Sequence, residues 1–332
     1  MGKTKIIIGT SLNVYLNLAY EEYLVDSAEP DEAVLFLWQN SDTVVIGCNQ
    51  NPWRECNLQA MERDQVKLSR RVTGGGAVFH DIGNMNFSFI VPKSMYDVTR
   101  QGSVIVKALE KIGLHAEQSG RNDITVDGRK FSGNAFLHRK NTSLHHGTVL
   151  IGADMSRLME YLNVDPLKLT GKGIQSVSSR VVNLREFIPD LSVETMMQVI
   201  SDSFSQEYGI PSEIIRTDLL SVTEKITALE TRNTSFEWLL GKTPHFSMNI
   251  RNRFSWGDLE IGFENKSAIV TKAMVFSDSL LPDFAPKISE SLAGSIFGSK
   301  TLSHAIRNIQ PDSEDERIML FDVSEWLENY SF

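Results

Sequence analysis

One stretch of this chain, residues 70–91 (RRVTGGGAVFHDIGNMNFSFIV), constrains its fold and function more than any other. It contains three adjacent glycines, Gly74, Gly75 and Gly76. Glycine adopts positive φ freely, and successive exposed N–H groups in such a turn form a concavity that suits an anion. Arg70 and Arg71 precede the turn and can pair with phosphate oxygens. Small and apolar residues follow it and can hold an adenine ring or an acyl chain: Ala77, Val78 and Phe79.

The alternative for this stretch is a plain glycine-rich turn between two strands, with two solvated arginines. Two common nucleotide-binding motifs do not fit it. No Lys-Ser or Lys-Thr follows at the spacing of a Walker loop, and the residues after the glycines alternate as a strand instead of opening a helix. The residues alone therefore leave two interpretations open, an anion-binding turn and a plain one.

A second cluster, SGRNDITVDGRKFSGNAF at 119–136, predicts a β-hairpin, because Asp-Gly at 127–128 suits a two-residue type I′ turn. The predicted cross-strand pairs are Val126 with Arg129, Thr125 with Lys130, Ile124 with Phe131, and Asp123 with Ser132. Because side chains alternate between faces, Ile124 and Phe131 share the core face. Asp123 and Lys130 share the polar face as diagonal neighbours, with Cβ atoms roughly 7 Å apart.

An ordinary cross-strand ion pair on a wet sheet face is the alternative to a site at Lys130 and Asp123. Gly120, Gly133 and Asn134 flank the two strands. Glycine inside a strand often marks the close approach of a ligand, which favours a site.

The adjacent histidines His145 and His146 and the His80-Asp81 pair do not predict a metal site. His145 and His146 are adjacent on a strand, so they point to opposite faces, and no matching Cys, Asp or Glu spacing lies nearby. His80 is followed by Asp81, and we expect both to make structural hydrogen bonds. No GxSxG elbow is present, which argues against a Ser-His-Asp hydrolase.

Residues 164–183 have no clear period and predict a long loop. The loop is either a flexible surface segment or a lid whose Lys172 and Arg180 close over phosphates.

The order of the predicted elements favours an α+β fold, because helices and strands mix without the steady alternation of a doubly wound sheet. A length of 332 residues favours two domains. The pattern breaks at Gly-Lys-Thr-Pro, 241–244, so we expect a large domain at 1–244 and a small accessory domain at 252–332.

Composition narrows the partners and the compartment. The net charge of −9 argues against nucleic acid as a partner. No apolar run reaches the length of a membrane span, and we expect neither a signal peptide nor membrane association. Two cysteines, Cys48 and Cys56, without CxxC spacing predict free thiols in a reducing compartment, hence a cytoplasmic protein.

Several segments, in order along nearly the whole chain, resemble bacterial lipoate–protein ligases of the LplA type. They are NLAYEEYL (17–24), VLFLWQNSDTVVIGCNQNPWRECN (34–57), RRVTGGGAVFHDIGN (70–84), GRNDITVDGRKFSGNA (120–135), HHGTVLIGADMSRL (145–158) and KGIQSVSSRVVNL (172–184). The resemblance implies a mixed sheet with flanking helices, similar to the catalytic fold of biotin ligases and class II aminoacyl-tRNA synthetases, plus a small α+β C-terminal domain. Cys48 stands where the family often has an arginine.

The resemblance also implies site residues. Lys130 would contact the acyl carbonyl and the phosphate, with Asp123 beside it as the second catalytic residue. The implied ATP and adenylate contacts are Arg71, Gly74, Gly75, Gly76, Ala77, Val78, Phe79, Asn84, Lys130, Lys172 and Arg180. The implied lipoate contacts are Lys130, Ala135, His146, Gly147 and Thr148. Residues 168–183 match the family's adenylate-covering loop, and the metal ligands stay open.

The implied activity is adenylation of lipoate with ATP and Mg²⁺, with release of pyrophosphate, followed by lipoyl transfer to a lysine. The implied partners are lipoate or octanoate and lipoyl domains of 2-oxoacid dehydrogenase complexes or the glycine cleavage H protein. An octanoyl or lipoyl transferase of the same fold is one alternative, but that chemistry usually needs a nucleophilic cysteine. A non-catalytic protein that binds lipoyl domains is another, and Arg71, Asp123 and Lys130 argue against it.

Overall fold

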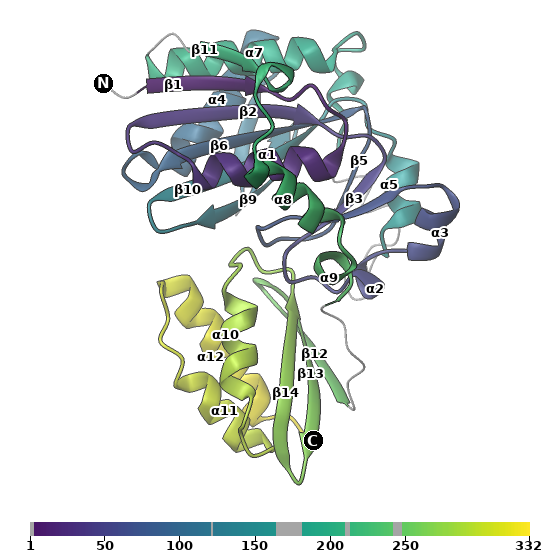
Figure 1. The fold of residues 1–332 in the computed structure, drawn as a ribbon, viewed down its shortest axis with the longest axis vertical. Helices are drawn as coiled ribbons and strands as arrows, with labels where there is room; N and C mark the ends of the chain where they lie inside the picture. Colours follow the sequence, from purple (N-terminus) through teal and green to yellow (C-terminus); the bar gives the residue numbers. More distant parts are fainter. Residues whose placement is uncertain (1–2, 121, 164–180, 210–212, 242–247) are drawn as a thin grey trace. The chain divides into compact units, whose positions relative to one another are not determined.

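The computed structural model describes residues 3–120, 122–163, 181–209, 213–241 and 248–332 (Figure 1). The chain divides into two compact units. The first comprises 1–46, 52–71 and 77–239, and the second comprises 47–51, 72–76 and 240–332. Strands and helices occur in both units, and the predicted α+β class is confirmed.

An eight-stranded sheet in the order β11-β1-β2-β6-β10-β9-β8-β7 forms the centre of the first unit. Its strands are β1 (Lys3–Ile8), β2 (Glu32–Gln39), β6 (Asn84–Pro92), β7 (Ala116–Ser119), β8 (Asp123–Val126), β9 (Arg129–His138), β10 (Thr142–Leu150) and β11 (Glu213–Arg216). β1 runs parallel to β2 and β11, and the other neighbouring pairs are antiparallel, so the sheet is mixed.

The two faces of this sheet have different chemistry, as β6 demonstrates. Met85, Phe87 and Phe89 point into the main hydrophobic core, which α4 (Val98–Lys111) and α7 (Val193–Tyr208) cover. The residue before each of them points to the opposite face and is polar: Asn84, Asn86 and Ser88. On that polar face lies α1 (Val14–Asp26), on the other side of the sheet from α4 and α7 (Figure 1).

A smaller sheet in the order β4-β3-β5 accompanies the large one. Its strands are β3 (Thr43–Ile46), β4 (Lys67–Arg70) and β5 (Val78–His80). The short helices α3 (Leu58–Arg63) and α5 (Met155–Tyr161) share a second apolar cluster with it, and α2 (Pro52–Glu55) precedes α3. The first unit also contains α8 (Glu224–Thr234), α9 (Phe236–Leu239), and the 3-10 turns η1 (Lys93–Met95), η3 (Leu184–Glu186) and η4 (Thr217–Leu219).

The hairpin of β8 and β9 has the predicted turn but a different register. Asp127 and Gly128 have φ of 50° and 69°, as a type I′ turn requires. The pairs Thr125–Lys130 and Val126–Arg129 are confirmed. The pairs Ile124–Phe131 and Asp123–Ser132 are wrong, because a β-bulge shifts the partners to Ser132 and Gly133. Ile124 and Phe131 are nevertheless both buried in the core, as expected.

The second unit contains a three-stranded antiparallel sheet and three helices around their own core. The elements are β12 (Met248–Phe254), β13 (Gly257–Lys266), β14 (Ile269–Ser277), α10 (Phe284–Leu292), α11 (Ser299–Arg307) and α12 (Glu314–Glu328). Residues 47–51 and 72–76 join this unit through backbone hydrogen bonds. The Gly75 N–H donates to the Ser279 carbonyl at 2.9 Å, and the Ser277 N–H donates to the Asn49 carbonyl at 3.0 Å.

Capping side chains determine where two helices begin. The Asp97 side chain caps α4 by accepting from the Arg100 N–H. The Asn57 side chain caps the start of α3, which is therefore separate from α2. Over the described ranges, the helices are all too short or too polar to cross a membrane.

Candidate active site

The predicted acyl-side residues lie on the polar face of the large sheet. β9 and β10 pair so that Ala135 is opposite His146, and β6 and β10 pair so that His146 is opposite Ser88. Thr148 is opposite Asn86 in the same register. Gly133 and Ala135 form a strip of small residues on this face.

Lys130 and Asp123 form an ion pair at one end of this face. Lys130 Nζ lies 2.6 Å from Asp123 Oδ1, and the two side chains are 37% and 38% exposed. The Lys130 side chain extends across Gly133: a Cβ at that position would lie 2.9 Å from Lys130 Nζ. The absence of a side chain at Gly133 therefore sets where the ammonium rests.

A buried hydrogen-bond chain holds His146 at the other end. His146 Nδ1 lies 2.8 Å from Glu21 Oε1, and the Ser88 hydroxyl donates to the same oxygen at 2.6 Å. The Trp38 indole N–H then donates to Ser88 Oγ at 3.0 Å. Glu21 is 1% exposed and Glu22 is 7% exposed. Both carboxylates are paired inside the fold, Glu22 with Arg232.

His145 points to the opposite face, as predicted. Its Nε2 lies 2.9 Å from Asn134 Oδ1 and its Nδ1 lies 3.0 Å from Gln101 Oε1. Burial, and secondarily the charge of His146, lower the pKa of His145 to about 3. The ring is therefore a neutral core group.

Gly147 has a packing reason to lack a side chain. An ideal Cβ there would lie 2.5 Å from Phe87 Cζ and 2.6 Å from Asn134 Oδ1. Both neighbours occupy the core side of the sheet, so the glycine lets β6 and β9 side chains close over β10.

The residues around the glycine run divide between the two units. Gly74, Gly75 and Gly76 belong to the second unit, and Arg71 and the residues from Ala77 onward belong to the first. Arg71 is 7% exposed and donates from Nη1 to the Val45 carbonyl at 3.2 Å. Arg70 donates to the carbonyls of Trp238 and Leu239 at 2.9 and 2.8 Å, so its guanidinium holds α9.

β5 is an edge strand of the small sheet within the described part of the chain. Phe79 is 2% exposed and packs against Tyr161 with ring centroids 5.4 Å apart, so its side chain is part of the core. Ala77 and Val78 are half-buried. This strand can therefore offer a ligand its backbone and the small surface of Ala77 and Val78.

Asn84 and Asp81 lie at the entry to β6. Asp81 accepts from the N–H groups of Gly83 and Asp154, both at 2.7 Å, and so makes the structural hydrogen bonds that the sequence predicted. Asn84 is fully buried, and its Oδ1 is without a hydrogen-bond partner among the residues that the structure describes.

The predicted lid residues Lys172 and Arg180 fall outside the described residues. The chain is described again from Val181, which forms a parallel bridge with Lys130. The Val182 N–H donates to the Lys130 carbonyl at 2.9 Å. The end of the predicted covering loop thus lies directly beside the Lys130 backbone.

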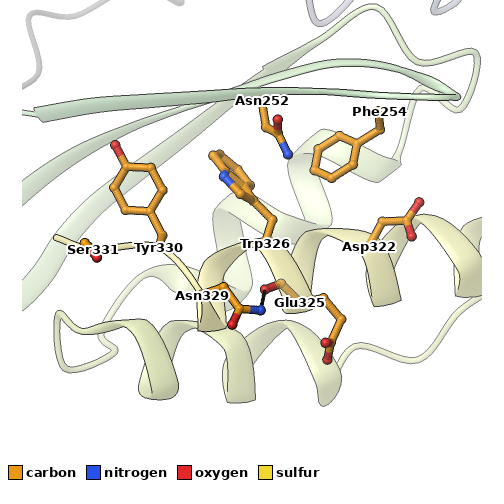
Figure 2. A pocket seen from close by; sticks show the side chains of 8 residues that line it. All are labelled: Asn252, Phe254, Asp322, Glu325, Trp326, Asn329, Tyr330 and Ser331. Carbon is orange, nitrogen blue, oxygen red and sulfur yellow. Dashed lines mark hydrogen bonds between the residues drawn. The ribbon is translucent and has the colours of Figure 1, made fainter.

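The second unit has a cavity of about 560 Å³ between β12 and α12 (Figure 2). It is open and partly aromatic, with Phe254, Trp326 and Tyr330 beside Asp322 and Glu325. None of the residues that line it was predicted for the site.

Both cysteines are free and buried. Burial, and secondarily the nearby Glu55 carboxylate, raise the pKa of the Cys56 thiol to about 12. The Cys56 thiol therefore stays protonated at pH 8, and the thiolate is the nucleophilic form.

We therefore expect Cys56→Ala to retain adenylation within about threefold, and Cys56 to resist alkylation in the folded protein at pH 8. Alkylation of Cys56 should be observed only when the protein unfolds. Mass spectrometry after iodoacetamide treatment checks this, and rapid labelling of folded protein at Cys56 would contradict it.

The comparisons with known proteins agree with this arrangement. A family model described as the lipoyl protein ligase A/B catalytic domain matches residues 13–205, and one described as the bacterial lipoate protein ligase C-terminus matches 243–327. A protein of Psychrobacter cryohalolentis named lipoate-protein ligase A is 40% identical over 332 residues, 98% of each chain. The chain belongs to the lipoate–protein ligase A family, whose members are ligases.

Solved structures extend the likeness. A crystal structure of Plasmodium falciparum LipL1 in complex with lipoate matches with a TM-score of 0.87 and 27% identity, over 98% of this chain and 100% of that one. A crystal structure of lipoate-protein ligase A bound with ATP matches with a TM-score of 0.62 and 27% identity, over 73% of this chain and 99% of that one.

Proposed function

We propose that this protein activates lipoate with ATP to lipoyl-AMP and then transfers the lipoyl group to a lysine of an acceptor protein. The observation that carries this proposal is the Lys130–Asp123 pair on the polar sheet face, at one end of a small-residue strip. Membership of the lipoate–protein ligase A family supports it.

The Lys130 ammonium lies over Gly133, which is two positions before Ala135 on β9. Lipoate can therefore place its carboxylate at Lys130 and direct its acyl chain along Ala135 toward His146. Glu21 and Ser88 hold His146 in place there.

In the first step a lipoate carboxylate oxygen attacks the α-phosphorus of ATP, and pyrophosphate leaves. Negative charge accumulates on the α-phosphate oxygens, and a fixed ammonium at Lys130 stabilises it. Arg71, Asn84, the backbone of residues 74–79 and, as the sequence predicts, Lys172 and Arg180 bind the nucleotide. The adenylate turns a poor acyl donor into one with AMP as leaving group.

In the second step the neutral amine of the acceptor lysine attacks the acyl carbonyl, AMP leaves with the C–O bond electrons, and the nitrogen gives up one proton to solvent. Lys130 would also contact that carbonyl oxygen. No covalent enzyme intermediate is needed, which is compatible with a protonated Cys56 thiol.

Mg²⁺ enters this scheme with the nucleotide. Magnesium usually keeps several waters and takes most other ligands from substrate phosphates, so it does not require a dedicated protein cage. The described residues contain no group of three or more His, Cys, Asp or Glu side chains placed to hold a metal. We therefore propose that Mg²⁺ arrives bound to ATP and takes its ligands mainly from the phosphates and water.

Lipoyl domains of 2-oxoacid dehydrogenase complexes or the glycine cleavage H protein are the proposed acceptors, with lipoate or octanoate as the acyl substrate. We place the chemistry in residues 1–244 and an accessory role in 252–332. The free cysteines support a reducing, cytoplasmic setting.

Lipoate-dependent exchange between ATP and labelled pyrophosphate tests the proposal. A ligase catalyses exchange without an acceptor protein, because adenylation is reversible. An acyltransferase that uses a carrier-bound acyl group, or a non-catalytic binding protein, gives no exchange. Absence of exchange with pure, folded protein would overturn the proposed function.

A further inference from the structure

A chain of buried amides fixes the position of one proton in the first unit. It begins at Asn17, whose Nδ2 lies 2.9 Å from the carbonyl oxygens of both Ser11 and Gln39. Backbone carbonyl oxygens only accept hydrogen bonds, so the Asn17 atom that faces them is the nitrogen. The same Nδ2 lies 2.9 Å from Asn40 Oδ1, so its two hydrogens are shared among three acceptors. The Asn40 atom at this place is the oxygen, because an amide nitrogen there would face another donor.

The orientation of Asn40 determines the tautomer of His80. With its oxygen on Asn17, Asn40 turns Nδ2 toward His80 Nδ1 at 3.0 Å. An amide nitrogen only donates, so His80 Nδ1 accepts and carries no proton. The proton of the neutral ring must then be on Nε2, at the edge of the ring away from Asn40.

This Nε2–H donor is buried and unused. His80 is 3% exposed, and Nε2 has no hydrogen-bond partner among the described residues. Burial, and then the charges of Arg71 and His146, lower the pKa of His80 to about 3, so the ring stays neutral at physiological pH. Buried donors without an acceptor are rare in folded proteins.

The location of His80 indicates what completes this hydrogen bond. His80 ends β5, directly after the Ala77–Phe79 segment. Its ring meets the Trp38 ring edge-on with centroids 6.5 Å apart, and Trp38 belongs to the hydrogen-bond chain that holds His146. The donor therefore lies among residues of the polar sheet face.

We infer that His80 is a ligand-binding residue that donates from Nε2 to an anionic oxygen of a carboxylate or phosphate substrate, and that Asn40 and Asn17 are positioning residues that keep it a donor. This inference rests on the proposed function. The oxygen belongs to the lipoate carboxylate or to a phosphate of ATP. A donor whose direction is set before the ligand binds needs no reorganisation when charge develops.

Replacing Asn40 by aspartate tests the tautomer directly. In Asn40→Asp a carboxylate oxygen faces Nδ1 and draws a proton onto it, and it raises the pKa of His80. Above that raised pKa the neutral ring carries its proton on Nδ1, so Nε2 turns a lone pair toward the ligand oxygen. Below it both nitrogens are protonated, and the Nε2 donor returns. The charged groups around His80 that add to this titration are Arg71, His146 and, through His146, Glu21.

The measurement is calorimetric binding of lipoate and of ATP, separately, at several pH values between 5 and 9. In Asn40→Asp, affinity for the ligand that His80 contacts should fall about ten- to a hundredfold as pH rises, as for a lost hydrogen bond to a charged group. The wild-type protein should lack this dependence. The ligand whose affinity changes identifies the oxygen. Asn233→Asp is the control, because it also introduces a carboxylate at a buried asparagine but does not contact His80. Asn233 is 1% exposed and contacts Tyr15 and Arg232.

A second pair of variants does not depend on Asn40. The glutamine amide nitrogen occupies the place of histidine Nε2, and the asparagine amide nitrogen that of Nδ1. His80→Gln should retain binding within about threefold, and His80→Asn should lose it about tenfold or more. Long-range ¹H–¹⁵N spectra of histidine-labelled wild-type protein should show His80 with unprotonated Nδ1.

The outcomes separate this inference from the proposed function. If wild-type protein supports pyrophosphate exchange but Asn40→Asp binds both ligands as wild type does at all pH values, the inference is wrong. Equal, pH-independent weakening in Asn40→Asp and Asn233→Asp would also overturn it, since that indicates a structural role. Absence of exchange in wild-type protein contradicts the proposed function instead.

Discussion

Lys130→Ala should reduce lipoyl-AMP formation about 10²–10³-fold while the protein stays folded. The ammonium stabilises charge that grows on the α-phosphate, and the loss of one such donor typically costs about 3–4 kcal/mol of transition-state stabilisation. The fold should survive because Ile124 and Phe131 carry the core contacts of the hairpin, whereas the ion pair is more than a third exposed. An exposed pair contributes at most about 1 kcal/mol to stability.

Single-turnover formation of lipoyl-AMP and thermal unfolding measure the two quantities. Lys130→Arg should not restore full activity, since a planar fork cannot replace a point donor between two oxygens. The matched control is Arg129→Ala, because Arg129 is the neighbouring cation and pairs with Glu186 at 2.8 Å. If Lys130→Ala forms lipoyl-AMP at a near-normal rate, Lys130 is not a catalytic residue.

Gly133→Ala should slow adenylation about tenfold to a hundredfold without a comparable loss of stability. The new Cβ would meet Lys130 Nζ at 2.9 Å and Cε at 3.0 Å, so the end of a flexible side chain must move. A misplacement of about 1 Å in a reacting group can cost on the order of 10²-fold in rate. The backbone itself need not shift, because only the Lys130 side chain lies within 4 Å.

A double-mutant cycle distinguishes displacement of Lys130 from a general disturbance. In the Lys130→Ala background, Gly133→Ala should have little further effect on the rate. Gly298→Ala is the control substitution, since a Cβ there meets only Thr301 Oγ1 at an ordinary 3.4 Å. Rate losses that multiply in the double variant would show that Gly133 does not act through Lys130.

The local parts of the site could be predicted from the sequence. The type I′ turn follows from two residues, Asp127 and Gly128, and it brings Lys130 opposite Thr125. The register beyond Thr125 could not be predicted, because a bulge depends on the packing of Phe131 in the core and not on the turn. Even so, Lys130 and Asp123 meet, as the hairpin predicted.

Contacts between residues that are far apart in the chain could not be predicted from the sequence. Glu21 lies 125 residues from His146 and 67 from Ser88, so a local sequence pattern could not show that its carboxylate is buried and paired. The tautomer of His80 likewise depends on the orientations of the Asn17 and Asn40 amides, which the carbonyls of Ser11 and Gln39 determine.

The path of the chain between the two units has a consequence for the evolution and engineering of this protein. Unit boundaries fall at five peptide bonds, 46–47, 51–52, 71–72, 76–77 and 239–240, so the C-terminal unit is not attached through a single tether. The glycine turn borrows its hydrogen-bond acceptor from Ser279, more than 200 positions later. A modular exchange of the C-terminal unit between relatives would therefore have to carry residues 47–51 and 72–76 with it. The coding segments for 47–76 and for the C-terminal unit should therefore be inherited together. Crossovers should not be tolerated within the glycine turn or within residues 277–282, which contact it.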